Sequence, residues 1–391
     1  MERPQTVTER EGIHRETLFT AALIGVRSFI LVMFLVEIRR GNFGGPDVVR
    51  FQTLAHMGGT PWRDFPVEYA PLELLLIRAL FGAGILTAAA RLAVLAFIAD
   101  LAAWAAVRTG WGRRAGLFYL LVGLPVVILE LQRIDLVPVA VAAWAFVLVR
   151  RARPEMAGTT LALAVLMKVW PLVLLPGLWI RGRTRSLWSF VAAAVLGAVA
   201  WIAWGGSDAL SQVLSFRGAR GWEAGSTVGS LVWVIGGGPV RDESGAARVG
   251  TAPAWAKVAL AVVLLAVLVS VWRRAAHRGK DVAGSPAFTA VAALLLLSPL
   301  FSTQYVLWLL PWAAVAAIDD DHPAVLLTGT FIISVTTALI ATFLYGGARD
   351  PIVKIASIVR LVVLACLVVR GLTSGGSTPE SVSLAAPTTA R

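Results

Sequence analysis

Apolar runs of about 15 to 25 residues recur along almost the whole chain, and they constrain the fold more than any other feature. A helix needs about 20 apolar residues to cross a bilayer, whereas a barrel strand alternates apolar and polar residues over about ten. The chain is 58% hydrophobic and 15% charged, while a soluble domain is about 25% charged. We therefore predict an all-α polytopic membrane protein with about 10 to 12 transmembrane helices. They are expected at residues 18–38, 88–107, 115–131, 134–150, 157–180, 186–205, 253–272, 285–301, 303–318, 323–345 and 351–370.

Basic residues lie in short clusters between these runs. The formal charge is +12, but no Lys/Arg-rich tract or nucleic-acid motif is present, so we expect no nucleic-acid partner. Cytoplasmic loops carry the excess of Lys and Arg, which predicts that the clusters at 108–114, 150–153, 181–185 and 273–280 are cytoplasmic. The single cysteine, Cys366, lies in an apolar run, which excludes a disulfide framework or a cysteine metal site.

This orientation depends on two irregular segments. Residues 71–84 are too few to cross a membrane alone, and residues 157–180 are interrupted by Pro171. All four clusters are cytoplasmic if residues 71–84 form a half-helix and the proline break lets 157–180 enter and leave by the same side. Two long loops, about 39–70 and 206–252, then face outward. We divide the chain into a cytoplasmic segment 1–17, a transmembrane domain 18–371 and a disordered cytoplasmic tail 372–391.

Polar and charged residues gather on the predicted outer face, and this follows from the topology without any motif. Carboxylates stand there beside Arg and Lys, which suits an amphiphile with a phosphate head and a polar group to be transferred. A carboxylate in such a site can act as a base. The candidate site residues are Asp47, His56, Asp64, Glu68, Tyr69, Gln132, Arg133, Asp135, Lys168, Arg217, Arg220, Glu223, Ser302, Gln304 and Tyr305.

Asp47 begins an amphipathic stretch that ends at Met57, which predicts an interfacial helix. Asp47 is either the N-cap of that helix, a role that Asp fills routinely, or a functional carboxylate. His56 is a base, a hydrogen-bond donor to phosphate, or a solvated side chain. Lys168 lies in an apolar run, where a charge costs on the order of 3 kcal/mol unless it faces a polar cavity. A functional role is therefore the default interpretation of Lys168.

Other charges have a purely structural alternative. Glu130, Arg133 and Asp135 can pair with one another at a helix turn, and Asp100 can form an interhelical pair with Arg27 or Arg91. No GxxxxGK[ST], strand-linked GxGxxG, HExxH or GxSxG motif is present, so a nucleotide-driven or a protease or lipase mechanism has no visible site.

Five short segments, taken in order, carry a family resemblance. Gly58 to Pro71, GGTPWRDFPVEYAP, is similar to a G-x-x-P-Y-R-D-F-x-x-E-Y-P-P motif. It is followed by 131–138 (LQRIDLVP), 167–171 (MKVWP), 217–230 and 298–308. Together they resemble the bacterial membrane glycosyltransferases of family 87, in the GT-C superfamily.

The resemblance implies the inverting transfer of a sugar, most often mannose, from a polyprenyl phosphate to a lipid-linked or cell-envelope glycan acceptor. By position, Asp47 would be the catalytic base, and Lys168, Arg217 and Arg220 would lie near the departing phosphate. The donor is already activated, so no cofactor is needed, and no ligand cluster argues for a metal. The site would face the outside of the plasma membrane. The alternative from another class is a lipid-linked sugar flippase or transporter, with a site at the bilayer midplane.

Overall fold

The computed structural model describes residues 7–42, 45–180, 184–214, 219–243, 246–278, 281–344 and 350–373. Helices dominate this part of the chain, and one small three-stranded sheet lies in the second long loop. The prediction of an all-α polytopic membrane protein is confirmed.

The elements follow one another along the chain as helices with few interruptions. The first half contains α1 (Val7–Arg39), α2 (Pro46–His56), α3 (Pro71–Phe81), α4 (Ile85–Trp111), α5 (Arg113–Gly123), η1 (Leu124–Val126), α6 (Val127–Glu130), α7 (Leu136–Arg150), α8 (Pro154–Met167), η2 (Trp170–Leu174) and α9 (Leu175–Trp179). The second half contains α10 (Thr184–Gly205), α11 (Ala209–Leu214), β1 (Trp222–Glu223), α12 (Thr227–Gly236), β2 (Arg241–Glu243), β3 (Ala246–Val249), α13 (Ala254–Arg278), α14 (Ser285–Leu297), η4 (Thr303–Trp308), α15 (Leu310–Ala316), α16 (Pro323–Leu344) and α17 (Asp350–Thr373).

Within the described residues, six helices are long and apolar enough to cross a membrane, namely α1, α4, α10, α13, α16 and α17. Shorter apolar helices, among them α7, α8 and α14, complete the bundle. The run expected at 115–131 is not one helix but three, α5, η1 and α6. Pro125 lies in η1, at the break. A proline lacks the N–H that a continuous helix would need there.

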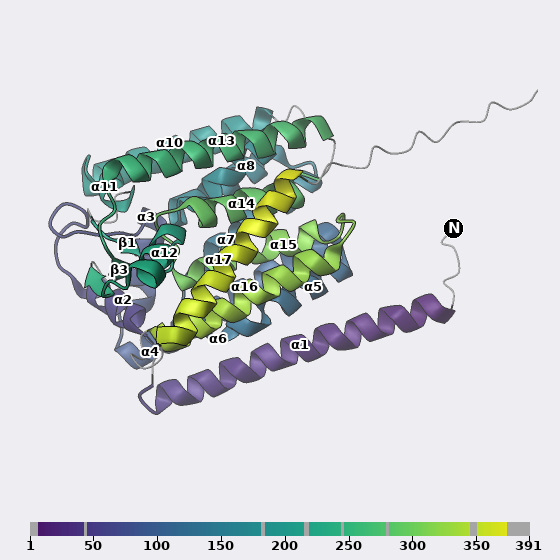
Figure 1. Ribbon diagram of the computed structural model, residues 1–391, viewed down its shortest axis with the longest axis horizontal. Coiled ribbons are helices and arrows are strands. Elements are labelled where there is room, and N and C mark those ends of the chain that lie inside the picture. The colour runs from purple at the N-terminus through teal and green to yellow at the C-terminus, as the bar shows by residue number, and fades with distance from the viewer. Residues whose placement is uncertain are drawn as a thin grey trace, which may run out of the picture.

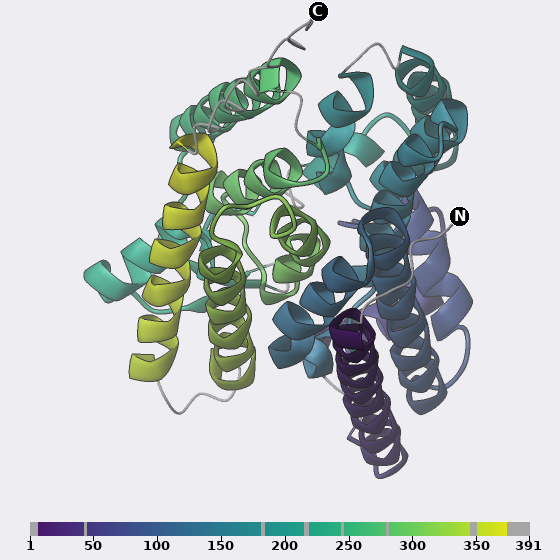
Figure 2. The same cartoon turned by 90° about the vertical axis from the view of Figure 1, so that its right-hand side faces the viewer.

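The two ends of the bundle differ in what they contain. Figure 1 shows α2, α11, α12 and the strands gathered at one end, which we call the loop end, and the start of α1 and the end of α17 at the other. In Figure 2 the purple-to-blue helices of the first half lie on one side and α16 and α17 on the other. At the opposite end, Asp281 accepts a hydrogen bond from Trp111 (2.8 Å) and pairs with Arg150, which ties three turns together. We call this the basic end.

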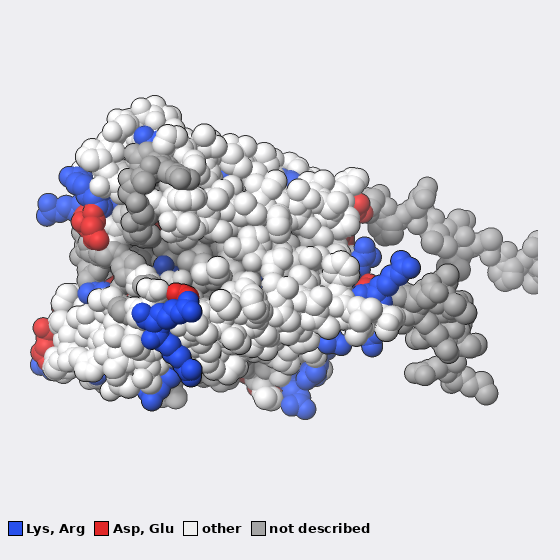
Figure 3. Space-filling model, turned by 90° about the horizontal axis from the view of Figure 1, so that it is seen from below, with Lys and Arg blue, Asp and Glu red and all other residues white. Residues whose placement is uncertain are grey.

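Charge is distributed as a membrane protein requires. Figure 3 shows one face of the molecule. Most of its Lys and Arg side chains lie near the two ends, and a wide stretch of uncharged surface lies between them. The exposed side chains of α10 and α13 are largely apolar, with Leu196 72% and Leu265 62% exposed. Such surface is stable against lipid tails and not against water.

The segment from α8 to α9 enters and leaves the bundle on the same side, as the proline break predicts. Gly158 of α8 lies against Ser186 of α10, and Leu166 further along α8 lies against Gly197 of α10. Both helices therefore run in the same direction, so the chain between them must return through η2 and α9. Lys168, at the point of return, is thereby placed towards the loop end.

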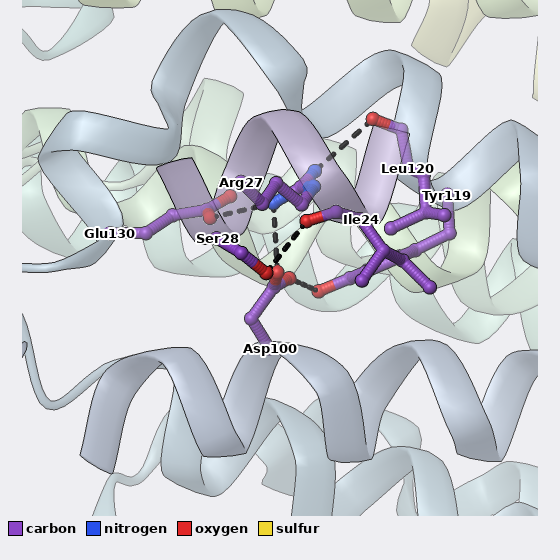
Figure 4. Close-up of polar contacts among 7 residues, drawn as sticks. All are labelled: Ile24, Arg27, Ser28, Asp100, Tyr119, Leu120 and Glu130. Atoms are coloured by element: carbon purple, nitrogen blue, oxygen red, sulfur yellow. Dashed lines mark hydrogen bonds and ion pairs between the residues drawn. The ribbon is translucent and has the colours of Figure 1, made fainter. Parts of the chain in front are cut away.

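A buried charge cluster joins α1 to the bundle (Figure 4). Nη1 of Arg27 lies 2.8 Å from Asp100 in α4 and 2.9 Å from Glu130 in α6. Tyr119 donates a hydrogen bond of 2.7 Å to Asp100, and Nη2 of Arg27 donates to the carbonyl of Leu120 at 3.1 Å. The predicted interhelical pair of Asp100 is therefore formed with Arg27.

Candidate functional site

A cavity of about 810 Å³ extends from the loop end along α13. Its charged part, the polar chamber, is lined by Asp47, Glu68, Tyr69, Glu73, Lys168, Glu223, Arg248, Ser302, Gln304 and Tyr305. Its other part, the apolar arm, is lined mainly by Leu172, Val173, Pro176, Trp179, Ile180, Leu265, Leu268, Val269, Trp272, Leu294 and Leu295. The volume is that of a site for a small molecule or for part of a larger one.

Asp47 enters the polar chamber from the first turn of α2. Gly45, not Asp47, is the N-cap of this helix, and its N–H donates to the side chain of Gln132 at 3.0 Å. Oδ2 of Asp47 pairs with Arg133. Asp47 is thus held by Arg133 and at the same time lines the polar chamber.

Lys168 lies between two carboxylates. Its Nζ is 2.8 Å from Oδ1 of Asp135 and 3.5 Å from Oε1 of Glu73, and all three side chains are mostly buried. The backbone of Lys168 is extended because α8 ends at Met167, which releases the side chain from the helix. The two carboxylates compensate the buried positive charge of Lys168, which the sequence placed in an apolar run without a visible partner.

Pairing of Glu130, Arg133 and Asp135 with one another was the structural alternative, but their ion pairs in the structure are made with other segments. Each of these residues pairs with a different element: Glu130 with Arg27, Arg133 with Asp47 and Asp135 with Lys168. The short turn between α6 and α7 therefore connects the buried cluster of α1 to the polar chamber.

Aromatic rings form the wall beside Lys168. The ring of Trp308 stacks on Trp170 with centroids 5.2 Å apart and on Tyr305 with centroids 4.0 Å apart. Nζ of Lys168 lies 5.5 Å from the centre of the Tyr305 ring, and Trp308 donates its N–H to Asp135 at 2.9 Å. This packing fixes the rotamers of Lys168 and Asp135, because each has an aromatic neighbour as well as an ionic one.

Glu223 lines the chamber from β1 and is 8% exposed. Burial raises the pKa of its carboxyl to about 7, and the positive charges of Arg248 and Arg360 oppose that increase. The nearby Ser302 side chain and Phe301 backbone also act to lower the pKa of this carboxyl. Glu223 therefore changes its charge near neutral pH.

Glu68 is held at the edge of the chamber by a two-point interaction. Nε and Nη2 of Arg50 lie 2.9 and 2.7 Å from its two carboxylate oxygens. The next residue, Tyr69, packs edge-on against Phe51 of α2 with ring centroids 5.6 Å apart. This pairing fixes the loop before α3 against α2.

The apolar arm runs along one face of α13. Leu265, Leu268, Val269 and Trp272 follow the spacing of a single helix face, and Arg273 and Ala276 continue it. From Leu265 to Ala276 the face is about 16 Å long, at roughly 1.5 Å per residue. The opposite wall is η2 and α9, where Trp179 is 57% exposed. The arm is thus an apolar channel open to the surrounding lipid.

Several predicted residues do not line the cavity: Arg133 and Asp135 contact residues that do line it, Gln132 bonds Gly45, and His56, Asp64 and Arg220 lie away from it. His56 is exposed, and its ring bonds the carbonyl of Gln52 within α2. Asp64 is exposed and accepts the N–H of Thr60 at 2.6 Å. Arg220 is exposed outside the cavity, and Arg217 lies outside the described residues.

Three residues that line or support the polar chamber were not predicted from the sequence. Glu73 stands in an apolar run, the same signal that singled out Lys168, and was detectable in that way. Arg50 and Arg248 carry no such signal, because they lie in the polar segments 39–70 and 206–252, where an arginine is ordinary. Within the ranges given above, no three His, Cys, Asp or Glu side chains lie close enough to hold a metal ion.

Sequence comparison assigns the chain to a family. The family model for glycosyltransferase family 87 matches residues 67–303, which include most of the cavity lining but not Asp47. No curated protein sequence matches the chain. Since the family match covers more than half of the 391 residues and agrees with the polytopic fold, the chain belongs to glycosyltransferase family 87.

Proposed function

We propose that this membrane glycosyltransferase transfers a sugar, mannose by family resemblance, from a polyprenyl phosphate to a lipid-linked or glycan acceptor. The observation that carries the proposal is the continuity of the polar chamber with the apolar arm. A polyprenyl phosphate sugar has the same division, with a charged polar head and a long apolar tail. The tail would occupy the arm beside α13, and the phosphate and sugar would occupy the chamber.

Asp47 is proposed as the general base. Asp47 lines the chamber, and its ion pair with Arg133 fixes the orientation of the carboxylate. In the reaction, the acceptor oxygen attacks C1 of the sugar, the C1–O bond to phosphate breaks, and the acceptor proton passes to Asp47. The phosphate is the leaving group and takes the bonding electrons. Inversion at C1 follows from a single displacement.

Purified protein in vesicles provides the test of this function. Supplied with a polyprenyl phosphate carrying radiolabelled mannose and with an extract of cell-envelope glycolipids, it should release polyprenyl phosphate and label an acceptor. A lipid-linked sugar transporter would instead move the intact donor between leaflets. Movement of donor without any transfer would overturn the proposal.

We also propose that the loop end faces the outside of the plasma membrane. The basic end carries Arg150 and neighbouring arginines, and cytoplasmic loops are the ones enriched in such residues. In a Cys366→Ala background, a cysteine at Pro239 should react with a membrane-impermeant thiol reagent in intact cells. A cysteine at Arg153 should react only after the membrane is opened. The reverse pattern would contradict this orientation.

A further inference from the structure

We infer that Arg248 is the residue that binds the phosphate of the lipid donor, an inference that rests on the function proposed above. Arg248 lies in β3, is 4% exposed and lines the polar chamber. Nothing in its sequence surroundings distinguishes it from other loop arginines. Its assignment comes from the geometry of the small sheet.

The guanidinium of Arg248 is fixed but not saturated. Nη1 donates to the carbonyl of Gly221 at 2.9 Å, and Nε donates to the carbonyl of Glu243 at 3.3 Å. Nη2 has no hydrogen-bond partner among the residues that the structure describes. Two backbone carbonyls therefore orient the guanidinium group of Arg248. Its remaining N–H groups are available to a ligand in the chamber. A planar, oriented guanidinium is well suited to binding a phosphate.

The neighbours of Arg248 add to this argument. In the sheet, Arg248 is directly opposite Glu223 of β1 on one side and Arg241 of β2 on the other. Glu223 also lines the chamber, whereas Arg241 is exposed outside it, so of these two opposed arginines only Arg248 faces the cavity.

Lys168 is a weaker candidate for the same role. Its ammonium is already shared between Asp135 and Glu73, so the local charge of that group is negative when both acids are ionised. A phosphate would have to displace one of them. Among the described basic side chains at the chamber, Arg248 is the one with an unused donor nitrogen.

The experiment compares binding of undecaprenyl phosphate with that of undecaprenol, which lacks only the phosphate. Native mass spectrometry of the full-length protein with equal amounts of both lipids gives their bound ratio. Wild-type protein should prefer the phosphate, and Arg248→Gln should lower this preference on the order of 10- to 100-fold, the loss expected for a charge-assisted hydrogen bond. Arg241→Gln is the matched control, since Arg241 is a neighbour in the sheet but is exposed outside the cavity. Its preference should stay within about twofold of wild type, a change below one ordinary hydrogen bond.

A second measurement does not depend on folding of the variant. Phenylglyoxal modifies accessible arginines, and undecaprenyl phosphate, but not undecaprenol, should protect Arg248 of the wild-type protein. Modification of Arg248 at the same rate with either lipid would overturn the inference, as would an unchanged preference in a folded Arg248→Gln variant. If wild-type protein itself shows no preference for the phosphate, the proposed donor is wrong, which is a distinguishable result.

Discussion

Nζ of Lys168 lies 2.8 Å from Oδ1 of Asp135, and the same oxygen accepts the N–H of Trp308 at 2.9 Å. One carboxylate oxygen thus joins the return point after α8, the turn before α7 and the aromatic wall of η4. Glu73 completes the group from α3. This group holds together four segments that are remote in the sequence.

Replacing Lys168 by Met should therefore lower stability as well as activity. The substitution leaves Asp135 and Glu73 buried without their cation, which typically costs about 3 to 5 kcal/mol. Thermal unfolding in detergent measures the loss. The double variant Lys168→Met/Glu73→Gln should recover much of it, because the second change removes one uncompensated charge.

The recovered double variant also separates stability from chemistry. If it uses the donor as well as wild type does, Lys168 has a structural role only. If it is stable but slow with donor, Lys168 contributes to the reaction directly.

The Asp47→Asn variant should be folded, modestly destabilised by loss of the ion pair with Arg133, and nearly inactive. Asn keeps the shape of the side chain, and Gly45 rather than Asp47 caps the helix, so the start of α2 is preserved. Loss of a general base typically lowers the rate about 10²- to 10⁴-fold. Single-turnover transfer rates and thermal unfolding would be compared with those of Asp64→Asn, whose carboxylate lies outside the cavity. Normal transfer by the Asp47→Asn variant would remove Asp47 from the reaction.

Glu223 should make donor binding depend on pH. Its pKa is raised to about 7 by burial, so it is neutral below pH 7 and anionic above. An anion beside the phosphate site repels the donor, and affinity for undecaprenyl phosphate should therefore fall as pH rises from 6 to 8. The Glu223→Gln variant should retain high affinity throughout that range, whereas an unchanged slope in this variant would contradict the assignment.

Stability should follow the same titration. Between the ordinary pKa of Glu, 4.5, and the raised value of about 7, folded protein binds more protons at Glu223 than unfolded protein does. The free energy of unfolding therefore decreases as pH rises through this interval. The decrease should be smaller in the Glu223→Gln variant, as denaturation at pH 5 and pH 8 would reveal.

The Arg27→Met substitution should destabilise the protein by about 3 to 5 kcal/mol, since Asp100 and Glu130 then remain buried without a cation. Arg91→Met is the control, because Arg91 lies in the same helix as Asp100 but is exposed. Its effect should be within about 0.5 kcal/mol, as is usual for exposed positions. Equal melting temperatures of the two variants would show that the cluster contributes little to stability.

Much of the fold could be predicted from the sequence, because a bilayer imposes a fixed length and composition on each span. The break at Pro171 and the return of the chain after α8 were predicted for the same reason. The extent of α1 was not, since the helix starts at Val7 in polar sequence that no span requires. Domain boundaries inside the chain remain predictions.

The site was harder to predict. Lys168 was identified because a charged residue within an apolar run is unfavourable in a membrane, and such a run can be recognised from the sequence alone. The partners were not identified, because Arg133 could reach Glu130, Asp135 or Asp47, and only packing decides among them. Arg248 was missed because its orientation depends on strands of two to four residues, which carry no usable periodicity.

Because the apolar arm along α13 is open at the surface of the bundle, the relevant donor concentration for this enzyme is that in the membrane, not that in the aqueous phase. The lipid donor proposed above, with its tail in this arm, would reach the site from the membrane without passing through water. Its encounter rate would be set by its mole fraction among the lipids and by two-dimensional diffusion. Diluting a fixed amount of donor with inert phospholipid should then slow transfer, whereas adding buffer at constant lipid composition should not. The membrane would be the substrate reservoir, and its composition would set the rate of transfer.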